Sequence, residues 1–504
     1  MARVTLEEIV SPRLRMWLVV LPILGCLTFY YIFLATAGTY RNTTFSSNYY
    51  NHMSEGFRHG HLYIQETPSA ALLAKPNPFD SSNFSLWFWD ASLYKGRYYL
   101  YWGPVPALLL LLFKGIARYH GTIIDQWPTL LFMLGRLYAG AAIILRMSRY
   151  VRTRMPAWFV GLSILIFGLA SPTPFIVARP HIYEACLAAG QCFLFWGLYS
   201  ALCGIINANR RVVLYLLAGI LWALAIGSRV TSLIPVPLMV LTTLLFTWLR
   251  SDRAIRPVLR PMLAISVPVA LAIGGYALYN YLRFESVFEF GLKYQVTLQR
   301  FFTSRQFIVP NIFSYLFAPV VWSCKFPFVI SLTYRPLSSL ITWPPGYQNF
   351  ERVAGMFTTS YWTWLVVIPV WRILAAALRF IRKGAQVSPS ALASIEVWLS
   401  FCSVALILSM WPALGLWEAS MRYLDDALGG VLLLSIFAGL WLLRQSSKLK
   451  RLANRFGVRF VLLALGLLTC FVGAFSGIAT YYDTFKQDNP ALYASLEKSL
   501  SVCK

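Results

Sequence analysis

The chain has 504 residues, of which 58% are hydrophobic, 16% aromatic and only 12% charged. This composition is typical of a polytopic membrane protein and excludes an ordinary soluble domain. A formal net charge of +25 would suggest a nucleic-acid partner in a soluble protein, whereas in a membrane protein lysine and arginine gather on cytoplasmic loops. We therefore use charge to predict orientation and expect no nucleic-acid partner.

The predicted membrane-spanning helices are apolar windows of about 20 residues, the length that crosses a bilayer. In chain order they occupy residues 16–37, 127–147, 157–178, 182–206, 212–228, 230–249, 262–282, 361–381, 395–415, 424–444 and 458–478. The first window is longer than a signal-peptide core and lacks a convincing cleavage site, so we interpret it as a retained span. The sequence thus predicts an all-α polytopic membrane protein with about 11 transmembrane helices.

A further apolar stretch, residues 104–115, is too short for a span. It opens with two prolines, follows several aromatic residues and ends beside Lys114 and Arg118. An aromatic entry and a basic exit are typical of a helix that lies in the headgroup plane. We therefore expect a juxtamembrane helix on the outer face, with Asp90 at the outer interface just before it.

Orientation follows from the basic clusters, which all fall on one side of the membrane if residues 104–115 stay outside the bilayer. The clusters are residues 146–154, 209–211, 250–260, 379–383 and 444–459. The positive-inside rule makes that side cytoplasmic, with the N-terminus inside and the C-terminus outside. Residues 1–480 then form a single transmembrane domain with outer loops 38–126 and 283–360, followed by an outer tail, residues 481–504. Few acidic residues lie inside, namely Glu7, Glu8, Asp252 and Glu396, so we expect carboxylate chemistry at the outer face.

Ionisable residues gather at the outer ends of the predicted spans. They are Asp90, Arg179, His181, Glu184, Arg229, Glu418, Arg422, Asp425 and Asp426. Charged groups at this depth are costly and usually face a cavity, so we expect them to line an outward-opening one.

The sequence contains no nucleotide-binding glycine motif, zinc-protease helix or hydrolase serine motif. Its eight cysteines have no zinc spacing, and His52, His59 and His61 have no fixed partner, so we predict no metal site.

Motifs in the first outer loop resemble the GT-C superfamily of membrane glycosyltransferases, in particular the aminoarabinose transferases and protein mannosyltransferases. Tyr49 is followed eleven residues later by Gly60 in "YYNHMSEGFRHGHLY", and "YWGPVPALLLL" stands where those families carry a Lys-Pro-Pro-Leu-type motif. The acidic pair that they place shortly before the tyrosine falls here on "TTFSS", and the lysine of the proline motif is absent. A closer resemblance is to a less characterised bacterial branch, on "NPFD", "DASLYKGRYYLYWGPVPALL", "RPHIYEACLAAG", "YNYLRFESVFEFGLKYQ" and "MRYLDD".

This resemblance implies a GT-C-like fold and transfer of a sugar, with inversion, from a polyprenyl-phosphate carrier to an envelope lipid or glycan. The reaction would take place on the periplasmic face of the bacterial inner membrane, where membrane lipid surrounds the enzyme. The implied general base is Asp90 or, second, Glu184, with Asp80 and Glu55 behind them. The predicted substrate-binding set is Arg179, Arg229, Arg422 and Lys325, which would neutralise the carrier phosphate, together with His181, Tyr98, Tyr101 and Trp102. No cofactor is predicted, although members of this superfamily sometimes use a divalent cation, which leaves Asp80 and Asp90 open as ligands.

Simpler interpretations stand beside these predictions. Asp90 could instead cap a helix entered near residues 91–93, and Glu184 could form a structural ion pair with Arg179. The alternative functions are a transporter or flippase of a lipid-linked glycan and a non-enzymatic assembly subunit. The chain shows no internal repeat, its predicted span count is odd, and most polar groups lie at outer span ends, which together favour the transferase over a transporter.

Overall fold

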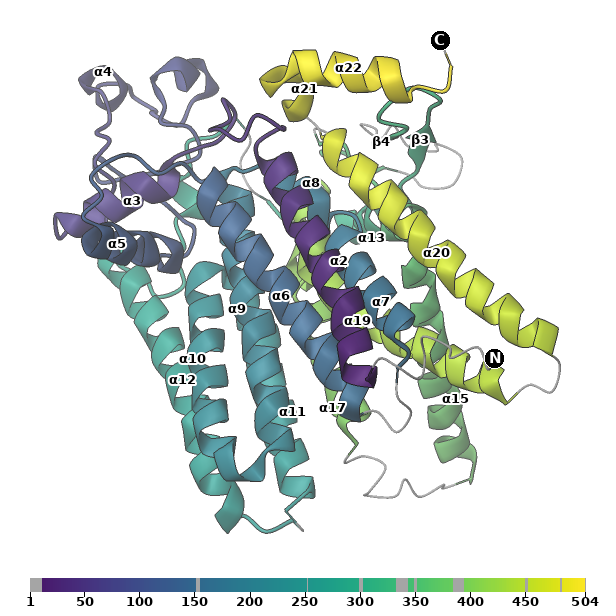
Figure 1. Cartoon of the computed structure of the whole chain (residues 1–504). Helices are drawn as coiled ribbons and strands as arrows, with labels where there is room; N and C mark the ends of the chain where they lie inside the picture. The colour runs from purple at the N-terminus through teal and green to yellow at the C-terminus, as the bar shows by residue number, and fades with distance from the viewer. Residues whose placement is uncertain are drawn as a thin grey trace.

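The computed structural model describes residues 11–150, 155–251, 253–298, 302–331, 343–348, 351–383, 394–448, 452–480 and 483–503. Nine of its helical stretches are long and apolar enough to cross a membrane, and Figure 1 shows them packed as a bundle. Their helices are α2 (Pro12–Ala35), α6 (Gln126–Tyr150), α9 (Ile182–Ile206), η2 (Ala208–Arg210) with α10 (Arg211–Ser228), η3 (Val230–Leu233) with α11 (Pro235–Leu249), α12 (Arg256–Phe284), α17 (Ile395–Leu408) with α18 (Trp411–Leu414), α19 (Met421–Ser447) and α20 (Leu452–Ile478). The predicted all-α polytopic membrane fold is confirmed.

One of the predicted spans is broken. Residues 157–178 form α7 (Ala157–Leu169) and α8 (Thr173–Ala178), whereas residues 361–381 form the 3-10 helix η6 (Tyr361–Val366), which continues directly into α15 (Val367–Lys383). Pro172 explains the break, because proline has no backbone N–H to donate and disfavours helical backbone at the residue before it. Within the described part of the chain, the 11 predicted spans therefore correspond to the nine long stretches, the broken α7–α8 segment and the η6–α15 segment.

Successive helices joined by short connections run in opposite directions, so their connections alternate between the two ends of the bundle. Arg149 in the last turn of α6, Arg210 between α9 and α10, and Arg250 after α11 all belong to connections at the same end. The long connections and the final helices lie at the other end, drawn at the top of Figure 1. This arrangement matches the predicted alternation. Glu7, Glu8 and Asp252 lie outside the described residues.

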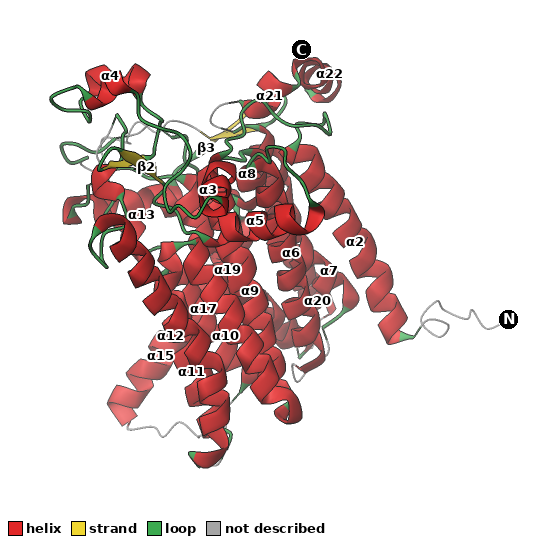
Figure 2. Cartoon of the chain, turned by 90° about the vertical axis from the view of Figure 1, so that its left-hand side faces the viewer, coloured by secondary structure: helices red, strands yellow, loops and turns green. Residues whose placement is uncertain are grey.

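The two long loops that are predicted to be outer, together with the tail, build a separate layer at that end, as Figure 2 shows from the side. We call it the outer layer after the predicted orientation. The first loop contributes α3 (Tyr49–Arg58), α4 (Ala70–Leu73), η1 (Ser81–Leu86), β1 (Ser92–Tyr94), β2 (Arg97–Tyr99) and α5 (Val105–Ala117). The second contributes η4 (Leu292–Tyr294), η5 (Arg305–Phe307), α13 (Ile308–Phe317), β3 (Val320–Trp322), β4 (Val329–Ser331) and α14 (Met356–Thr359), and the tail α21 (Thr484–Asp488) and α22 (Pro490–Leu500). Both strand pairs are antiparallel, with Ser92 opposite Tyr99 and Val320 opposite Ser331.

Helix α5 lies beside α3 and across the ends of the long helices, the orientation expected of a juxtamembrane helix (Figure 1). One detail differs from the prediction: Lys114, at the C-terminal end of α5, is not exposed. Its side chain is buried, and Nζ donates to Asn51 Oδ1 at 2.6 Å and to Glu55 Oε1 at 2.7 Å. A buried ammonium group requires such partners, so this lysine joins α5 to α3.

A second apolar core, distinct from that of the bundle, holds the first outer loop in place. It includes Tyr50, Leu93, Tyr98, Trp102, Ile182 and Val296, which come from α3, the β1–β2 hairpin, the start of α9 and the second outer loop. Next to Trp102, a Cβ atom on Gly103 would lie 2.2 Å from the carbonyl oxygen of Gly227 at the end of α10. Only glycine allows this close approach, which fixes the aromatic segment against the bundle.

A disulfide joins Cys324, in the turn between β3 and β4, to Cys503, just after α22. The backbone N–H of Val502 also donates to the Cys324 carbonyl oxygen at 2.8 Å. The spacing of the cysteines gave no sign of this pair, because the two residues are 179 positions apart. The bond fastens the tail to the second outer loop.

Candidate functional site

Asp90 lies in the turn between η1 and β1, with a backbone φ of 60°. Its N–H donates to the Val296 carbonyl oxygen at 3.0 Å, which ties the turn to the second outer loop. The next residues form strand β1, so the alternative that Asp90 caps a helix at 91–93 is wrong. Non-glycine residues in the left-handed region are uncommon and often occur at functional sites.

The Asp90 carboxylate is buried and hydrogen-bonded on both oxygens. Gln295 Nε2 donates to Oδ1 at 2.9 Å, and the Tyr183 hydroxyl donates to Oδ2. Burial raises the pKa of Asp90 above its usual value, although the bonds from Tyr183 and Gln295 oppose the rise. A carboxylate with a raised pKa is a better proton acceptor, so the environment suits a general base.

Aromatic rings surround this carboxylate. The ring of Tyr101 stacks on Trp102 with centroids 4.1 Å apart, and Trp102 meets the edges of Tyr49 at 5.7 Å and Tyr183 at 5.2 Å. Tyr101 also accepts a 3.4 Å hydrogen bond from Gln295. The predicted residues Tyr101 and Trp102 are thus next to Asp90, where flat apolar faces suit a sugar ring.

Tyr98, like Trp102, is part of the second apolar core. Its hydroxyl accepts a hydrogen bond from the Phe88 N–H at 3.2 Å. The alternation of strand β2 turns it into that core.

Two arginines and a glutamate form the cationic half of the site. Arg179, after α8, places Nη1 3.2 Å from Glu351 Oε1, and Arg422, in the first turn of α19, places Nη1 2.5 Å from the same oxygen. Ser420 donates to the other Glu351 oxygen. Burial alone would raise the pKa of Glu351, but Arg422 and Arg179 lower it to about 2, so this carboxylate is charged at neutral pH.

Tyr183 connects the two halves. Its hydroxyl donates to Asp90, while its ring centroid lies 4.5 Å from the Arg422 guanidinium. Tyr183 stands in the first turn of α9, so the start of one helix brings a buried acid from the first outer loop near a cation from α19. We define the candidate site as Asp90, Tyr183, Arg422, Glu351 and Arg179.

Glu184 and His181 border the cationic half. Glu184 is fully buried and lies 3.8 Å from Arg179 Nη1, and its oxygens accept no hydrogen bond from the residues that the structure describes. This contact agrees with the ion-pair alternative for Glu184. Burial, followed by the charges of Arg179 and Arg422, lowers the pKa of His181 to about 4, so this imidazole is neutral at neutral pH.

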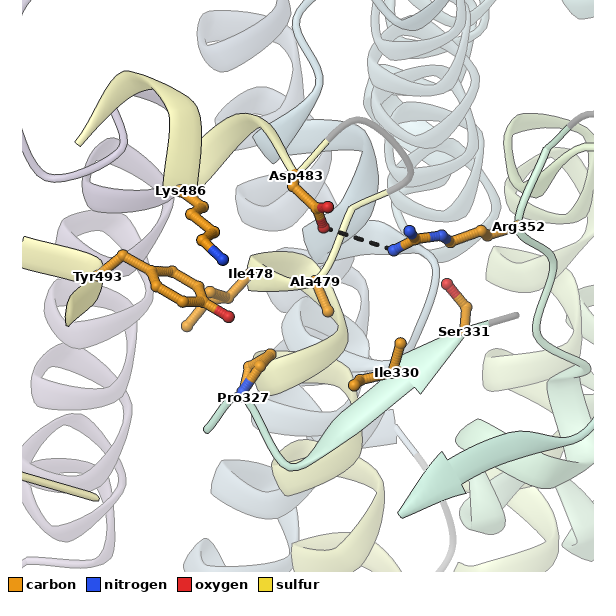
Figure 3. A pocket seen from close by; sticks show the side chains of 9 residues that line it. All are labelled: Pro327, Ile330, Ser331, Arg352, Ile478, Ala479, Asp483, Lys486 and Tyr493. Atoms are coloured by element: carbon orange, nitrogen blue, oxygen red, sulfur yellow. Dashed lines mark hydrogen bonds and ion pairs between the residues drawn. The ribbon is translucent and has the colours of Figure 1, made fainter. Parts of the chain in front are cut away.

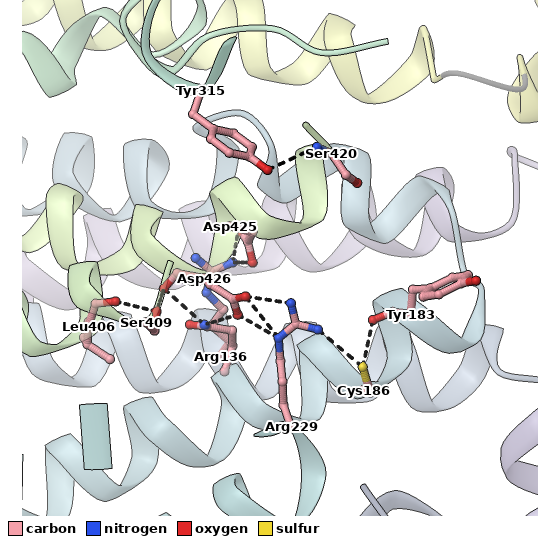
Figure 4. Close-up of polar contacts among 11 residues, drawn as sticks. Arg136, Tyr183, Cys186, Arg229, Tyr315, Leu406, Ser409, Ser420, Asp425 and Asp426 are labelled. Carbon is pink, nitrogen blue, oxygen red and sulfur yellow. Dashed lines mark hydrogen bonds and ion pairs between the residues drawn. The ribbon is translucent and has the colours of Figure 1, made fainter. Parts of the chain in front are cut away.

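Arg229 is buried and forms one of two neighbouring ion pairs, which Figure 4 shows. Its guanidinium forms a fork with Asp426, with Nε–Oδ1 at 2.8 Å and Nη2–Oδ2 at 2.6 Å. Beside it, Arg136 places Nη1 2.9 Å from Asp425 Oδ1. Arg229 is thus already matched by a carboxylate, whereas the sequence suggested a phosphate ligand. Removing one partner of such a buried pair typically costs about 3–5 kcal/mol.

The other predicted residues lie away from the site. Lys325 stands in the β3–β4 turn beside the disulfide, and no described contact joins it to Arg179 or Arg422. Asp80 is exposed and caps η1 by accepting from the Ser82 N–H at 2.9 Å, while Glu55 pairs with Lys114. Among the described residues, no three histidine, cysteine, aspartate or glutamate side chains gather closely enough to hold a metal ion.

No protein-family model and no curated protein matches this chain. Among solved structures, the apo oligosaccharyltransferase of Archaeoglobus fulgidus is similar over 92% of this chain and 56% of its own, with a TM-score of 0.48 and 12% identity. ArnT of Cupriavidus metallidurans bound to undecaprenyl phosphate is similar over 94% of this chain and 79% of its own, with a TM-score of 0.42 and 11% identity. The chain spans little more than half the length of the archaeal protein. These are likenesses of overall fold alone.

Sequence reasoning missed Tyr183, in the first turn of α9, and also Glu351 and Gln295, which are both in the second outer loop. Gln295 ends the motif "YNYLRFESVFEFGLKYQ", but its contact with Asp90 bridges 205 positions. Glu351 stands alone among uncharged neighbours and Arg352, with no spacing to a second carboxylate. The available signal for Glu351 was that it is an acidic residue outside the predicted membrane spans.

Asp125 is a buried carboxylate that stabilises the outer layer. It accepts from Ser47 Oγ at 2.5 Å and from the N–H groups of Tyr49 and Tyr50 at 3.0 and 3.3 Å, which caps the start of α3. Burial raises its pKa from 3.8 to about 6, although these donors oppose the rise. Between these values the folded chain binds more protons than the unfolded chain, so stability falls as pH rises through this window.

We therefore expect the unfolding free energy of the native protein to fall by about 3 kcal/mol between pH 4 and 6, and we expect no such fall in Asp125→Asn. Asparagine keeps part of the cap, because its Oδ1 still accepts from one of these N–H groups, while its NH2 group replaces the other oxygen. Unfolding free energies of both proteins in detergent, compared at pH 4, 5, 6 and 7, test this. Parallel curves for native protein and variant would contradict it.

Proposed function

We propose that this protein is a polyprenyl-phosphate-dependent glycosyltransferase that decorates an envelope lipid or glycan on the periplasmic face of the bacterial inner membrane. The observation that carries the proposal is the joining of Asp90 to Arg422 and Arg179 through Tyr183 and Glu351. A buried proton acceptor and a pair of cations lie near each other at the outer end of a transmembrane bundle. Transfer of a sugar from a phosphate carrier needs these two kinds of group.

In the proposed reaction, the acceptor hydroxyl attacks the anomeric carbon of the carrier-linked sugar. The hydroxyl proton passes to the Asp90 carboxylate as the new carbon–oxygen bond forms. The bond between the anomeric carbon and the phosphate oxygen breaks, and its electron pair leaves with the polyprenyl phosphate. Attack opposite the departing phosphate inverts the anomeric centre.

Arg422 and Arg179 would receive the charge that develops on the leaving phosphate. Guanidinium groups suit this task, because they remain charged and bind phosphate through two parallel N–H groups. Glu351 occupies both arginines in the free protein and keeps these buried cations paired. A bound phosphate would compete with this carboxylate for the same N–H groups. Tyr101, which is partly exposed and stacks on the buried Trp102, offers a ring face to the sugar beside Asp90.

A lipid-linked glycan transporter is the second candidate. A discontinuous helix favours it, since the predicted span at 157–178 is broken into α7 and α8. The candidate site nevertheless includes Asp90 and Glu351, which belong to the outer loops, whereas transporters usually place substrate groups near the middle of the bilayer. The position of the site therefore favours the transferase.

The experiment that separates these functions uses the purified full chain in lipid nanodiscs. Polyprenyl-phosphate sugars are offered with a lipid extract as acceptor, and release of polyprenyl phosphate is measured over time. Enzymatic transfer predicts carrier release that needs both substrates. Movement of intact carrier across proteoliposomes without release would instead support the transporter.

The disulfide provides a test of the proposed orientation. Disulfides persist in oxidising compartments, and Cys324–Cys503 lies in the outer layer. We expect Cys324→Ser to leave Cys503 open to a membrane-impermeant maleimide applied to spheroplasts, while the native protein is labelled there only after reduction. A double variant, Cys324→Ser with Cys503→Ser, is the matched control. Labelling that requires permeabilised membranes would contradict the periplasmic placement.

A further inference from the structure

A second candidate binding site lies in the outer layer, apart from the residues that surround Asp90. It is a cavity of about 320 Å³, lined by Pro327, Ile330, Arg352, Asp483, Lys486 and Tyr493 among others. Figure 3 shows these side chains approaching one another from the β3–β4 hairpin, the segment at 352 and the α21–α22 tail. Small-ligand pockets begin at about this volume, which suits one compact headgroup.

The walls of this cavity are fastened together. The Cys324–Cys503 disulfide joins the hairpin to the end of α22, and the Phe326 N–H donates to Ser501 Oγ at 3.0 Å. The Val502 N–H donates to the Cys324 carbonyl oxygen at 2.8 Å. A ligand would therefore meet walls already held in place, and less conformational freedom would be lost on binding.

Charge favours an anion in this cavity. Arg352 Nη1 lies 3.4 Å from Asp483 Oδ1, and both side chains are partly exposed, at 29% and 49%. Lys486 contributes a second cation, with Nζ 5.2 Å from the centre of the Tyr493 ring. The lining thus carries two cations and one carboxylate. A guanidinium, an ammonium and a phenol hydroxyl together are typical phosphate donors.

The position of the cavity favours a lipid as the source of the phosphate. Ile478, the last residue of α20, lines it together with Ala479, so it lies directly beyond the outer end of a membrane-spanning helix. Apolar walls from Pro327 and Ile330 complete a surface suited to the start of the acyl chains that follow a headgroup. We propose that this cavity binds a phosphate-bearing headgroup, supplied by an anionic lipid of the outer leaflet.

The test measures binding to the full-length protein in a neutral detergent by native mass spectrometry and thermal shift. Phosphatidylglycerol is the lipid probe, glycerol 3-phosphate is the soluble probe, and dioleoylglycerol is the phosphate-free control. We expect Lys486→Gln and Arg352→Gln to weaken phosphatidylglycerol binding about tenfold each, because each removes a charged hydrogen-bond donor. Asp483→Asn should strengthen binding, because it removes the carboxylate that competes for Arg352. Lys498→Gln, an exposed change on α22, is the matched control and should have no effect.

The opposite response of the cation and carboxylate variants separates a binding site from a general loss of structure. If only glycerol 3-phosphate responds to these variants, the phosphate site stands and its ligand is soluble. The proposal is overturned if neither phosphate compound binds, if dioleoylglycerol binds equally well, or if Lys498→Gln weakens binding as much as Lys486→Gln. It does not depend on sugar transfer, which can be measured in the same preparations.

Discussion

Replacing Asp90 with asparagine is expected to reduce sugar transfer by about a hundredfold or more, because the acceptor hydroxyl loses its proton acceptor. The amide has nearly the size of the carboxylate, and its oxygen still accepts a hydrogen bond from Tyr183 or Gln295. The variant should therefore fold and bind carrier phosphate as the native protein does. Release of polyprenyl phosphate in nanodiscs measures the first quantity, and retention of undecaprenyl phosphate on the purified protein measures the second.

The pH profile gives this prediction a second readout. Burial raises the pKa of Asp90, and only the deprotonated carboxylate accepts a proton. Transfer by the native protein should therefore rise with pH through this raised pKa and then level off, and the rise should be absent from the residual activity of Asp90→Asn. Asp80→Asn is the control, since Asp80 is an exposed cap in the same loop. Equal activity in Asp90→Asn and the native protein would exclude Asp90 as the base and make Glu184 the next candidate.

Replacing Arg422 with alanine is expected to weaken carrier-phosphate binding and to reduce transfer by about a hundredfold. Arg422 contacts both Glu351 and the ring of Tyr183, so it is the cation nearest to both halves of the site. Arg422→Lys should retain part of the binding, because lysine keeps the charge but not the forked pair of donors. Binding of undecaprenyl phosphate and the rate of transfer are measured for both variants.

The control for Arg422 is Arg97→Ala, an exposed arginine of the outer layer that stacks on Tyr63 at 4.3 Å. It removes the same charge from the same side of the protein without touching the site. Size-exclusion elution and melting temperature establish that each variant is folded. Normal carrier binding by folded Arg422→Ala would contradict the assignment of the phosphate position.

The membrane architecture could be predicted from sequence because its signals are local. Each of the nine long helical stretches lies in or around a run of apolar residues, and burial in a bilayer requires such runs to be helical. One exception is also local in origin, because Pro172 interrupts the third predicted span. The other is not local, because the buried position of Lys114 depends on Asn51 and Glu55, which lie 63 and 59 positions earlier in a neighbouring helix.

The candidate site could be predicted only in part. Asp90, Arg179 and Arg422 were recognisable as ionisable residues at the outer ends of apolar runs, where charge is unexpected. Their partners were not, because Glu351 and Gln295 carry no such local signal. Arg229 shows the converse, since its chemistry suited a phosphate but Asp426 already neutralises it.

By itself, the sequence determined that the chain crosses a membrane many times, which ends of its helices are basic, and that its carboxylates gather at the opposite ends. These properties depend on hydropathy and charge along short stretches of chain. Only the tertiary structure decided which partner each buried acid meets: Tyr183 donates to Asp90 across 93 positions, and Arg422 pairs with Glu351 across 71. Such pairs form because buried charges must find partners once the helices pack, and packing is a property of the whole chain.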